Sequence, residues 1–468
     1  MRLGWRMLAA SGLMLMPIRG LAASAADGHT TDDVDMIVTA APVFVPLAEL
    51  RGQERFPRGA QLLLVHCGKA EPLIGGFAAS ADANVSFDGQ SVLFAGKRAA
   101  GDAWQIWELT LKDRLVRKVI TTPGDAERPL YLPGGRMVWA ERTAEGFQLQ
   151  SADDGHPMTY TPWNPTAGPG VLSITYVHSS AFPADVLRDG RILFESGFPL
   201  GSGHSPELYL VYADGSGVES VRCDHGLARW GGTQLASGDV VFTHGTSLAR
   251  FTSPLAHEKP VQAPRATYAG AVQETSSGAW VMSARSAADA RFVIKLWEPG
   301  TATMHTIFAE GGEDLVESVL VAPRARPNRH PSGLHPWDYA NLLALDARIS
   351  RDSALHGVPV AVRLEVQNGA GHATTTGTAP VELDGSFFVQ VPADKPIRFS
   401  LIDRKGAVLR REHGWFWIRK GEQRICVGCH AGPEHAPENR VPAVLLRTTT
   451  PIDLTGAAPT QGAKAGGQ

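Results

Sequence analysis

The sequence is short of cysteine and of charged residues. It has 4 cysteines in 468 residues, and Asp, Glu, Lys and Arg together make up 19% of the chain. So few cysteines exclude a disulfide-rich scaffold, and the low charge without long charged repeats excludes a coiled coil. The formal net charge of -3 indicates no basic surface, so neither nucleic acid nor an anionic membrane is an expected partner.

Three common catalytic motifs are absent as well. The chain has no glycine-rich phosphate loop, no G-x-S-x-G nucleophile elbow and no H-E-x-x-H zinc helix. Its acidic residues are scattered without a pair that indicates acid–base catalysis. No catalytic residue is therefore predicted.

Long apolar runs are also missing. Residues 7–16 form an apolar stretch of about ten residues, and a bilayer span needs about 20. Arg2 and Arg6 precede this stretch, and the small residues 23–25 follow it. The pattern predicts a secretory signal peptide over residues 1–25 and export to the periplasm, with an uncleaved anchor as the alternative. No membrane span is expected in the mature chain.

Glycine and proline are abundant, with 50 and 32 residues, which favours an all-β protein with many turns. A turn with glycine followed by a short apolar strand recurs five times. The turn glycines are spaced 46, 55, 48 and 40 residues apart, at positions 89, 135, 190, 238 and 278. A period of 40 to 50 residues with several strands per unit is typical of a β-propeller.

We predict a propeller over residues 42–322 with six blades, or alternatively seven. The sixth blade would close by joining residues 61–65 to a late strand near residues 315–321. The blade segments resemble the WD40-like blades of TolB-type propellers, most closely at residues 86–109. A β-sandwich or a set of unrelated hairpins is the alternative interpretation.

A second domain is expected after a linker at residues 323–340, whose Pro, Arg and His content excludes a helix or a central strand. Alternating apolar residues, beginning at Val360 and Val362, predict a small β-sandwich over residues 341–448. The Gly-, Ala- and Thr-rich residues 449–468 are expected to be a disordered tail.

The strongest functional motif is Cys426-Val427-Gly428-Cys429-His430, the C-x-x-C-H pattern of c-type haem attachment. The two thiols bond to one edge of the porphyrin, and the following imidazole binds the iron. We therefore expect one covalent haem c, held by Cys426 and Cys429, with His430 as the proximal ligand. A disulfide between the two cysteines or half of a zinc site is the alternative.

Other residues are candidates for contacts with this haem. His413 is the preferred distal ligand, because 17 residues of chain give it ample reach; His372, His435 or a propeller histidine compete with it. Arg424 and Arg440 are candidate partners of the haem propionates, or else ordinary surface arginines. Aromatic residues 415–417 would either shield one haem face or belong to the sandwich core.

The remaining cysteines give a weaker signal. His66-Cys67 and Cys223-Asp224-His225 contain metal-ligand types, but neither group has an evident third partner. An ordinary surface role is the preferred interpretation of both. Whether Cys67 and Cys223 form a disulfide or stay as thiols is left open.

Taken together, these features are similar to the middle and C-terminal regions of the hydrazine synthase alpha subunit. The matching residues are 321–324 in the linker, 379–382, Asp384-Gly385-Ser386, 391–394, Pro396 and Gly421-Glu422 before the haem motif. The resemblance implies a six-bladed propeller followed by a haem-bearing domain. It also implies an additional haem, in an N-terminal domain, as the active site of hydrazine synthase. This chain has one C-x-x-C-H motif and no room for that domain before the first blade. The resemblance therefore predicts the scaffold and the single haem for this chain, but not the synthesis of hydrazine.

Three functions follow as expectations. The preferred one is a periplasmic monohaem cytochrome in which the propeller docks a redox partner protein and the haem transfers electrons. The second is a haem enzyme or enzyme subunit whose iron binds a small nitrogen or oxygen species. The third is a non-redox propeller that binds a peptide or an envelope polymer, with the C-x-x-C pair as a stabilising disulfide (a staple).

Overall fold

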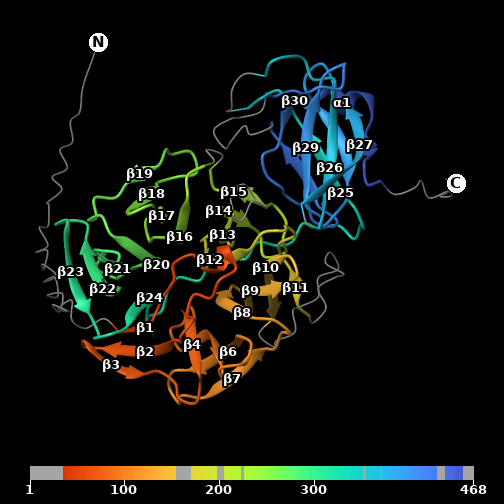
Figure 1. Ribbon diagram of the computed structural model, residues 1–468. Coiled ribbons are helices and arrows are strands. Elements are labelled where there is room, and N and C mark those ends of the chain that lie inside the picture. Colours follow the sequence, from red (N-terminus) through yellow and green to blue (C-terminus); the bar gives the residue numbers. More distant parts are fainter. Residues whose placement is uncertain are drawn as a thin grey trace, which may run out of the picture.

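The structure is a computed structural model that describes residues 35–153, 170–197, 205–222, 226–350, 355–369, 371–428 and 438–456. Two β-rich parts are visible in Figure 1, a ring drawn from red to green and a blue sandwich beside it. The predicted signal peptide lies outside the described residues. Within them, no helix is both long and apolar enough to cross a bilayer.

The ring is a β-propeller of six four-stranded antiparallel sheets, which confirms the six-bladed prediction over seven blades. Five blades are simple meanders, in which the chain runs from the innermost strand outward. They are β4 (Ala79–Val85), β5 (Ser91–Lys97), β6 (Gln105–Thr110), β7 (Val116–Ile120); β8 (Ala126–Leu132), β9 (Arg136–Thr143), β10 (Gly146–Asp153), β11 (Leu172–Ser173); β12 (Ala181–Val186), β13 (Ile192–Gly197), β14 (Pro206–Val211), β15 (Glu219–Ser220); β16 (Arg229–Gln234), β17 (Val240–His244), β18 (Ser247–Phe251), β19 (Lys259–Pro260); and β20 (Thr267–Glu274), β21 (Trp280–Arg285), β22 (Val293–Glu298), β23 (Thr303–Phe308).

The sixth blade joins the two ends of the propeller. Its order is β24 (Asp314–Leu320), β1 (Met36–Ala41), β2 (Gln61–His66) and β3 (Lys69–Pro72). The predicted segments 61–65 and 315–321 do share this sheet, but β1 lies between them and pairs with both. The predicted start at residue 42 leaves β1 out. Its six residues are all buried, so it lacks the alternation that marks a half-exposed strand.

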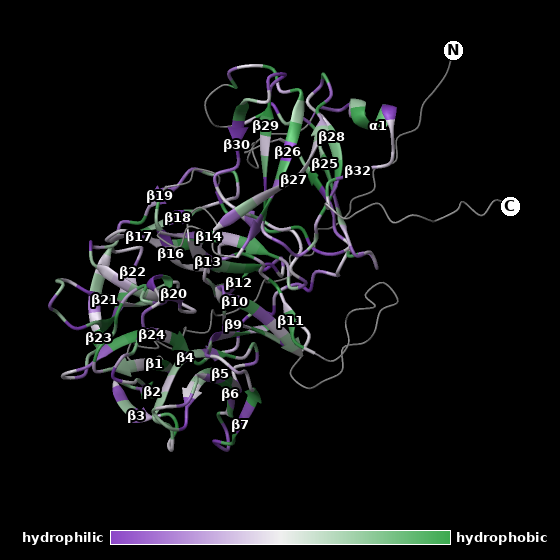
Figure 2. Ribbon diagram, turned by 45° about the vertical axis from the view of Figure 1, so that its right-hand side comes forward, coloured by the Kyte–Doolittle hydropathy of each residue, from purple (hydrophilic) through white to green (hydrophobic). Residues whose placement is uncertain are grey.

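The five predicted turn glycines all adopt positive φ. Each lies in the turn between the innermost strand of a blade and the next strand, as predicted. The strands that follow these turns are continuously apolar because neighbouring blades cover both of their faces, as in β5, where five consecutive residues are buried. Figure 2 shows hydrophobic residues, in green, along strands of the ring, and hydrophilic residues, in purple, in many of its loops.

The second domain is a sandwich of two four-stranded sheets. One has the order β31 (Gln423–Cys426), β25 (Ala340–Ala344), β28 (Phe387–Val391), β32 (Ile452–Asp453), and the other β27 (His372–Pro380), β26 (Ala361–Asn368), β29 (Ile397–Ile402), β30 (Val408–Arg411). The short elements η1 (Glu49–Arg51) and α1 (Ala443–Arg447) complete the described structure.

Part of the predicted disordered tail is ordered. β32 pairs in parallel with β28, and Leu454 is buried in the sandwich core. The composition of the tail concealed this strand because only Ile452 and Leu454 supply its apolar contacts. Residues 457–468 lie outside the described part.

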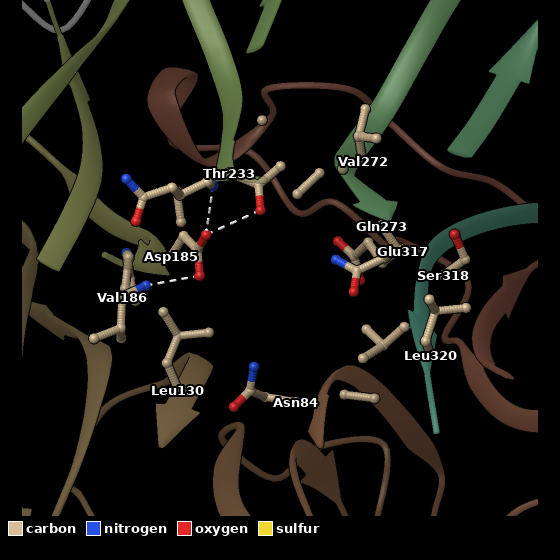
Figure 3. A pocket seen from close by; sticks show the side chains of 18 of the residues that line it. Asn84, Leu130, Asp185, Val186, Thr233, Val272, Gln273, Glu317, Ser318 and Leu320 are labelled. Carbon is tan, nitrogen blue, oxygen red and sulfur yellow. Dashed lines mark hydrogen bonds between the residues drawn. The ribbon is translucent and has the colours of Figure 1, made fainter. Parts of the chain in front are cut away.

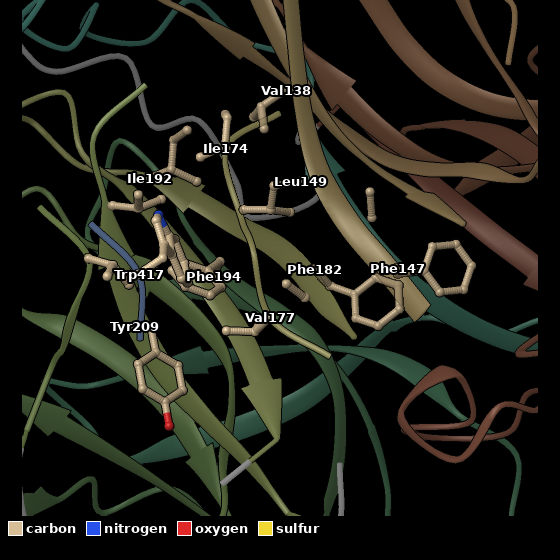
Figure 4. Packing of buried hydrophobic residues seen from close by; sticks show 14 of the residues in the cluster. Val138, Phe147, Leu149, Ile174, Val177, Phe182, Ile192, Phe194, Tyr209 and Trp417 are labelled. Atoms are coloured by element: carbon tan, nitrogen blue, oxygen red, sulfur yellow. The ribbon is translucent and has the colours of Figure 1, made fainter. Parts of the chain in front are cut away.

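The two domains meet through the tryptophans before the haem motif. Trp415 and Trp417 belong to the same buried cluster as Ile174 and Val218 of the propeller. Figure 4 shows Trp417 among blade residues, and its indole Nε1 donates to the Gly215 carbonyl at 2.9 Å. Trp417 is fully buried between the two domains. Its position therefore differs from the expected place in the core of the sandwich alone.

Candidate functional site

The haem-attachment segment begins at the end of an edge strand. β31 runs parallel to β25, with Ala344 opposite Cys426. The chain stays attached beyond the strand, because the Leu345 and Asp346 amides donate to the carbonyls of Cys426 and Val427 at 2.9 and 3.2 Å. The first cysteine of the motif therefore has a fixed backbone position on the sandwich.

The backbone around Gly428 leaves no space for a side chain at this position, and we call its contact with residues 346 and 349 the Gly428 cradle. A Cβ atom placed there would lie 2.8 Å from the Ile349 carbonyl oxygen and 2.9 Å from that of Asp346. Backbone atoms cannot yield as a flexible side chain could. Residues 426–428 of the motif therefore pack directly on the loop at residues 345–349.

The hairpin turn at residues 383–386 ties this loop to the chain on the far side of the motif. Arg348 donates to the Leu383 and Asp384 carbonyls at 2.8 and 2.9 Å. Asp384 accepts from the Ala443 amide at 2.7 Å and forms an ion pair with Arg440. Burial opposes ionisation of Asp384, but hydrogen bonds from Ser386, Ala443 and Arg440 outweigh it and lower its pKa to about 2. The segments before and after the motif are thus anchored at one end of the sandwich.

Arg424, predicted as a propionate partner, faces the domain interface. Its guanidinium pairs with Glu422 at 2.7 Å and donates to the carbonyls of Val218 and Trp417 at 3.4 and 3.3 Å. Glu422 also accepts from the Gly217 amide of the propeller at 3.2 Å. Arg440, the other predicted partner, is shared between Glu438 and Asp384. Both arginines lie next to the motif, and both already have carboxylate partners.

His413 lies in an exposed turn after β30. Its neighbour Glu412 is close enough to Cys426 to act on the thiol: burial raises the pKa of Cys426, Arg424 lowers it, and the carboxylates of Glu412 and Glu422 raise it further. His372, a competing candidate, lies at the exposed start of β27. Cys429, His430, His435 and Cys223 lie outside the described residues.

A second site, which the sequence did not indicate, is the axial channel of the propeller. A cavity of about 460 Å³ is lined by the innermost strands of the six blades. Figure 3 shows Asp185, Asn84, Gln273 and Glu317 around it. Phe44 lines the cavity from the insertion between β1 and β2, and the linker contributes Arg324. Asp185 accepts from Thr233 Oγ1 at 2.9 Å and from the Gln234 amide at 2.7 Å.

Buried charges meet beside this channel. Arg55, on the insertion between β1 and β2, pairs with Asp82 at 2.7 Å and also with Glu49, Glu127 and Glu317. We call these five residues the Arg55 cluster. Burial raises the pKa of Glu127 to about 8 and that of Glu317 to about 7, although the Arg55 charge lowers both. Arg128 also pairs with Glu49, at 3.2 Å, so two guanidiniums face four carboxylates, and part of the Arg55 cluster holds protons at neutral pH.

The backbone explains why these charges converge. Every innermost strand contains a break in its pairing register. Asp82, Arg128 and Glu317 take positive φ at three of these breaks, and Gly231 and Gly270 do so at two others. A β-bulge redirects a side chain, and at these breaks it turns toward the channel axis. The sequence does show a charged residue inside each of three short strands, Asp82 in β4, Arg128 in β8 and Glu317 in β24. Their spacing in the sequence could not show that these three strands lie around one channel.

The described parts of both sites lack a metal-ligand cluster. Within the described residues, no group of three or more His, Cys, Asp or Glu side chains has the geometry to hold a metal ion. His66 and Cys67 lie together on the turn between β2 and β3.

Comparisons with known proteins point to one family. The family model of the hydrazine synthase alpha subunit middle domain matches residues 351–431. Hydrazine synthase subunit alpha of Kuenenia stuttgartiensis is 28% identical over 99 residues, covering 19% of this chain and 12% of that protein. The similarity predicted from the residues around the haem motif is therefore confirmed, and the alignment spans only a small part of the curated relative.

One solved structure shows the same fold over a longer stretch of the chain. The Kuenenia stuttgartiensis hydrazine synthase structure superposes with a TM-score of 0.74 at 16% identity, covering 88% of this chain and 71% of that chain. TolB from Acinetobacter baumannii superposes with a TM-score of 0.44 at 14% identity, covering 62% of this chain and 67% of that chain. The first comparison supports the order of propeller and sandwich in this chain.

Proposed function

We propose that this chain is a monohaem c-type redox protein related to the hydrazine synthase alpha subunit. The observation that carries the proposal is the close contact of Gly428 with residues 346 and 349, which together with two backbone hydrogen bonds fixes the first three residues of the C-x-x-C-H motif at one end of the sandwich. Cys426 and Cys429 would hold one haem c covalently, and His430 would bind its iron. When bound, the haem would supply a one-electron iron couple.

The chain's own residues would set the environment of that haem. His413 is the proposed distal ligand, because the 17 residues between its position and that of His430 give its imidazole ample reach. The carboxylates of Glu412 and Glu422 would favour the more positive, oxidised iron, while Arg424 would oppose them. Exposed apolar side chains near the motif, such as Ile425 at 64% and Leu383 at 95% exposure, would provide a contact surface for a redox partner protein.

Electron transfer between partner proteins is the function that this arrangement supports best, with the propeller as a docking scaffold. Export to the periplasm, inferred from residues 1–25, would place the motif in a compartment where such haems are attached. A second candidate is a haem enzyme subunit acting on a small nitrogen or oxygen species. The name of the curated relative favours it.

Haem staining of the denatured, gel-separated chain tests the proposal, because a covalent haem survives denaturation. The chain should stain after expression with cytochrome maturation proteins, and a Cys426→Ala, Cys429→Ala variant should not. An unstained wild-type band would overturn the haem proposal and favour the staple interpretation.

Spectra of the purified protein separate the two redox functions. Electron transfer predicts a six-coordinate, low-spin iron that does not bind carbon monoxide, and a His413→Ala variant that becomes high-spin. His372→Ala is the matched control and should leave the spectrum unchanged. A high-spin wild-type protein that binds carbon monoxide or nitric oxide would instead support the enzyme subunit.

A further inference from the structure

The axial channel of the propeller forms a cavity that is separate from the haem motif. Its volume of about 460 Å³ is in the range of sites that hold a small molecule. Part of its wall is apolar and comes from four blades, through Leu130, Val186, Val272 and Leu320 (Figure 3). Polar groups stand at separate points of this wall, and such groups determine which kind of ligand a cavity accepts.

Asp185 presents a carboxylate to the cavity whose hydrogen-bond partners are all neutral. Its oxygens accept from the Val186 amide at 2.8 Å, from Thr233 Oγ1 at 2.9 Å and from the Gln234 amide at 2.7 Å. Burial raises the pKa of this carboxyl, while the hydrogen bonds and the charge of Arg324 lower it. Within the described part of the chain the carboxylate has no ion pair, although its side chain remains partly accessible. Its position is therefore fixed, and a cation can still approach it.

Arg324 and Asn84 place hydrogen-bond donors at the same cavity. Arg324 Nη2 donates to Asn84 Oδ1 at 3.5 Å and to the Val85 carbonyl at 3.3 Å, and the guanidinium lies over the Phe87 ring at 4.4 Å. Among the described residues, Nε and Nη1 of Arg324 have no hydrogen-bond partner. The Tyr131 amide donates to Asn84 Oδ1 at 3.0 Å, which leaves Asn84 Nδ2 pointing into the cavity in Figure 3. These unused donors suit a carboxylate.

The carboxylate of Asp185 and the guanidinium of Arg324 act on each other's charge without forming an ion pair. Two other charged side chains of the cavity are already paired: Glu317 belongs to the Arg55 cluster, and Arg128 pairs with Glu195 at 3.4 Å. A molecule with an ammonium group at one end and a carboxylate at the other would connect the first pair. Its apolar body would lie on the apolar part of the wall.

We propose that the channel cavity binds a small zwitterion with an apolar side chain, which is an amino acid or a short peptide. The ammonium group would donate to Asp185, and the carboxylate would accept from Arg324 and Asn84. Arg324 and Ala325 both line the cavity and are exposed, so the ligand would enter beside the linker. This binding site does not depend on the proposed redox function.

Isothermal titration calorimetry of the full-length chain tests the proposal with four probes. L-leucine and the dipeptide leucyl-leucine carry both charges, isoamylamine is leucine without the carboxylate, and isocaproate is leucine without the ammonium group. At least one of the two zwitterions should bind with a Kd below about 1 mM, and each single-charge analogue should bind at least about tenfold more weakly. The tighter of the two zwitterions identifies the ligand as an amino acid or as a peptide.

Two variants assign the two charges of the ligand. Asp185→Asn should weaken the better zwitterion about tenfold and leave isocaproate unchanged, while Arg324→Gln should weaken it about tenfold and leave isoamylamine unchanged. Arg326→Gln changes an exposed arginine of the same linker that does not line the cavity, and it should leave all affinities unaltered.

This pattern of losses distinguishes ligand contacts from a damaged fold, because a damaged fold would weaken all probes alike. The proposal falls if the wild-type chain binds neither zwitterion at about 5 mM, or if the single-charge analogues bind as tightly as the zwitterions. It also falls if Asp185→Asn and Arg324→Gln leave the affinity for the better zwitterion unchanged.

Discussion

At the scale of single residues, Gly428 shows how a motif depends on the loop that receives it. The substitution Gly428→Ala would place a methyl group within 3 Å of two backbone carbonyl oxygens. We expect a loss of about 1–3 kcal/mol in the free energy of unfolding, as for other overpacked sites, and a severalfold lower yield of stained haem protein. Thermal unfolding and haem staining measure the two effects.

Gly333→Ala is the matched control for that variant. A Cβ at Gly333 would meet nothing within 4 Å, so this change should leave both stability and haem staining unaltered. Equal behaviour of the two variants would show that the cradle does not constrain the motif.

The Arg55 cluster predicts a pH dependence of stability. The ordinary glutamate pKa is 4.5, and the folded chain raises those of Glu127 and Glu317 to about 8 and about 7. Between pH 4.5 and 8 the folded chain therefore holds more protons than the unfolded chain at these groups. The free energy of unfolding should fall as pH rises through this window by several kcal/mol in total, at about 1.4 kcal/mol for each unit of pKa shift.

The double variant Glu127→Gln, Glu317→Gln should flatten this fall, and at pH 8.5 it should be the more stable protein. Urea unfolding at pH 5, 7 and 8.5 is the measurement. Glu310→Gln, a change of an exposed side chain, is the control and should keep the wild-type slope. Parallel slopes for wild type and double variant would exclude proton storage at these two groups.

At the scale of elements, the linker rests on the glycine turns of the blades. A Cβ at Gly190 would lie 2.2 Å from the Asn328 carbonyl oxygen, and the Asn328 amide donates to the Arg188 carbonyl at 2.8 Å. Gly190→Ala should therefore displace the linker and expose it to trypsin near Arg326 and Arg329. Limited proteolysis with mass spectrometry would detect the new cleavage.

Gly278→Ala separates this contact from backbone strain. Gly278 occupies the same turn position with φ +82°, close to the +86° of Gly190, but a Cβ there would meet nothing within 4 Å. Both variants should lose about 1 kcal/mol or slightly more from the left-handed conformation. Only Gly190→Ala should release the linker, and similar digestion of both variants would contradict its docking there.

Trp417 is a fully buried contact between the propeller and the sandwich. Trp417→Ala should cost about 3–5 kcal/mol through the cavity it leaves, while Trp417→Phe should cost about 1–2 kcal/mol through the lost hydrogen bond to Gly215 and a smaller ring. In calorimetry the alanine variant should unfold in two separate transitions, since the domains would no longer stabilise each other. One unchanged transition for both variants would show that the interface rests on other contacts.

At the scale of the whole molecule, local sequence patterns predicted the architecture well, but they did not predict which distant residues come into contact. The Asp-Gly, Gly-Gly and Ser-Gly turns predicted five blades, because a positive φ is a local requirement that glycine meets. Arg55 and Glu317, by contrast, are separated by 262 residues. Neither the Arg55 cluster nor the place of Trp417 in a propeller blade could be inferred before the ring and the domain interface were known. The motif cysteine Cys426 was found from spacing alone, since its chemistry is encoded in five adjacent residues.

The strand exchange in the sixth blade also fixes the order in which the ring can assemble. β1 is among the first strands to be made, yet one of its two neighbours, β24, follows more than 250 residues later, as the 278-residue separation of Thr39 and Glu317 illustrates. Until then, one edge of a strand whose residues are all buried in the finished fold stays without its partner and can pair with another molecule. Loop closure over such a length is slow relative to local hairpin formation. The newly made chain would therefore depend on chaperones that shield its early strands until synthesis has passed residue 320.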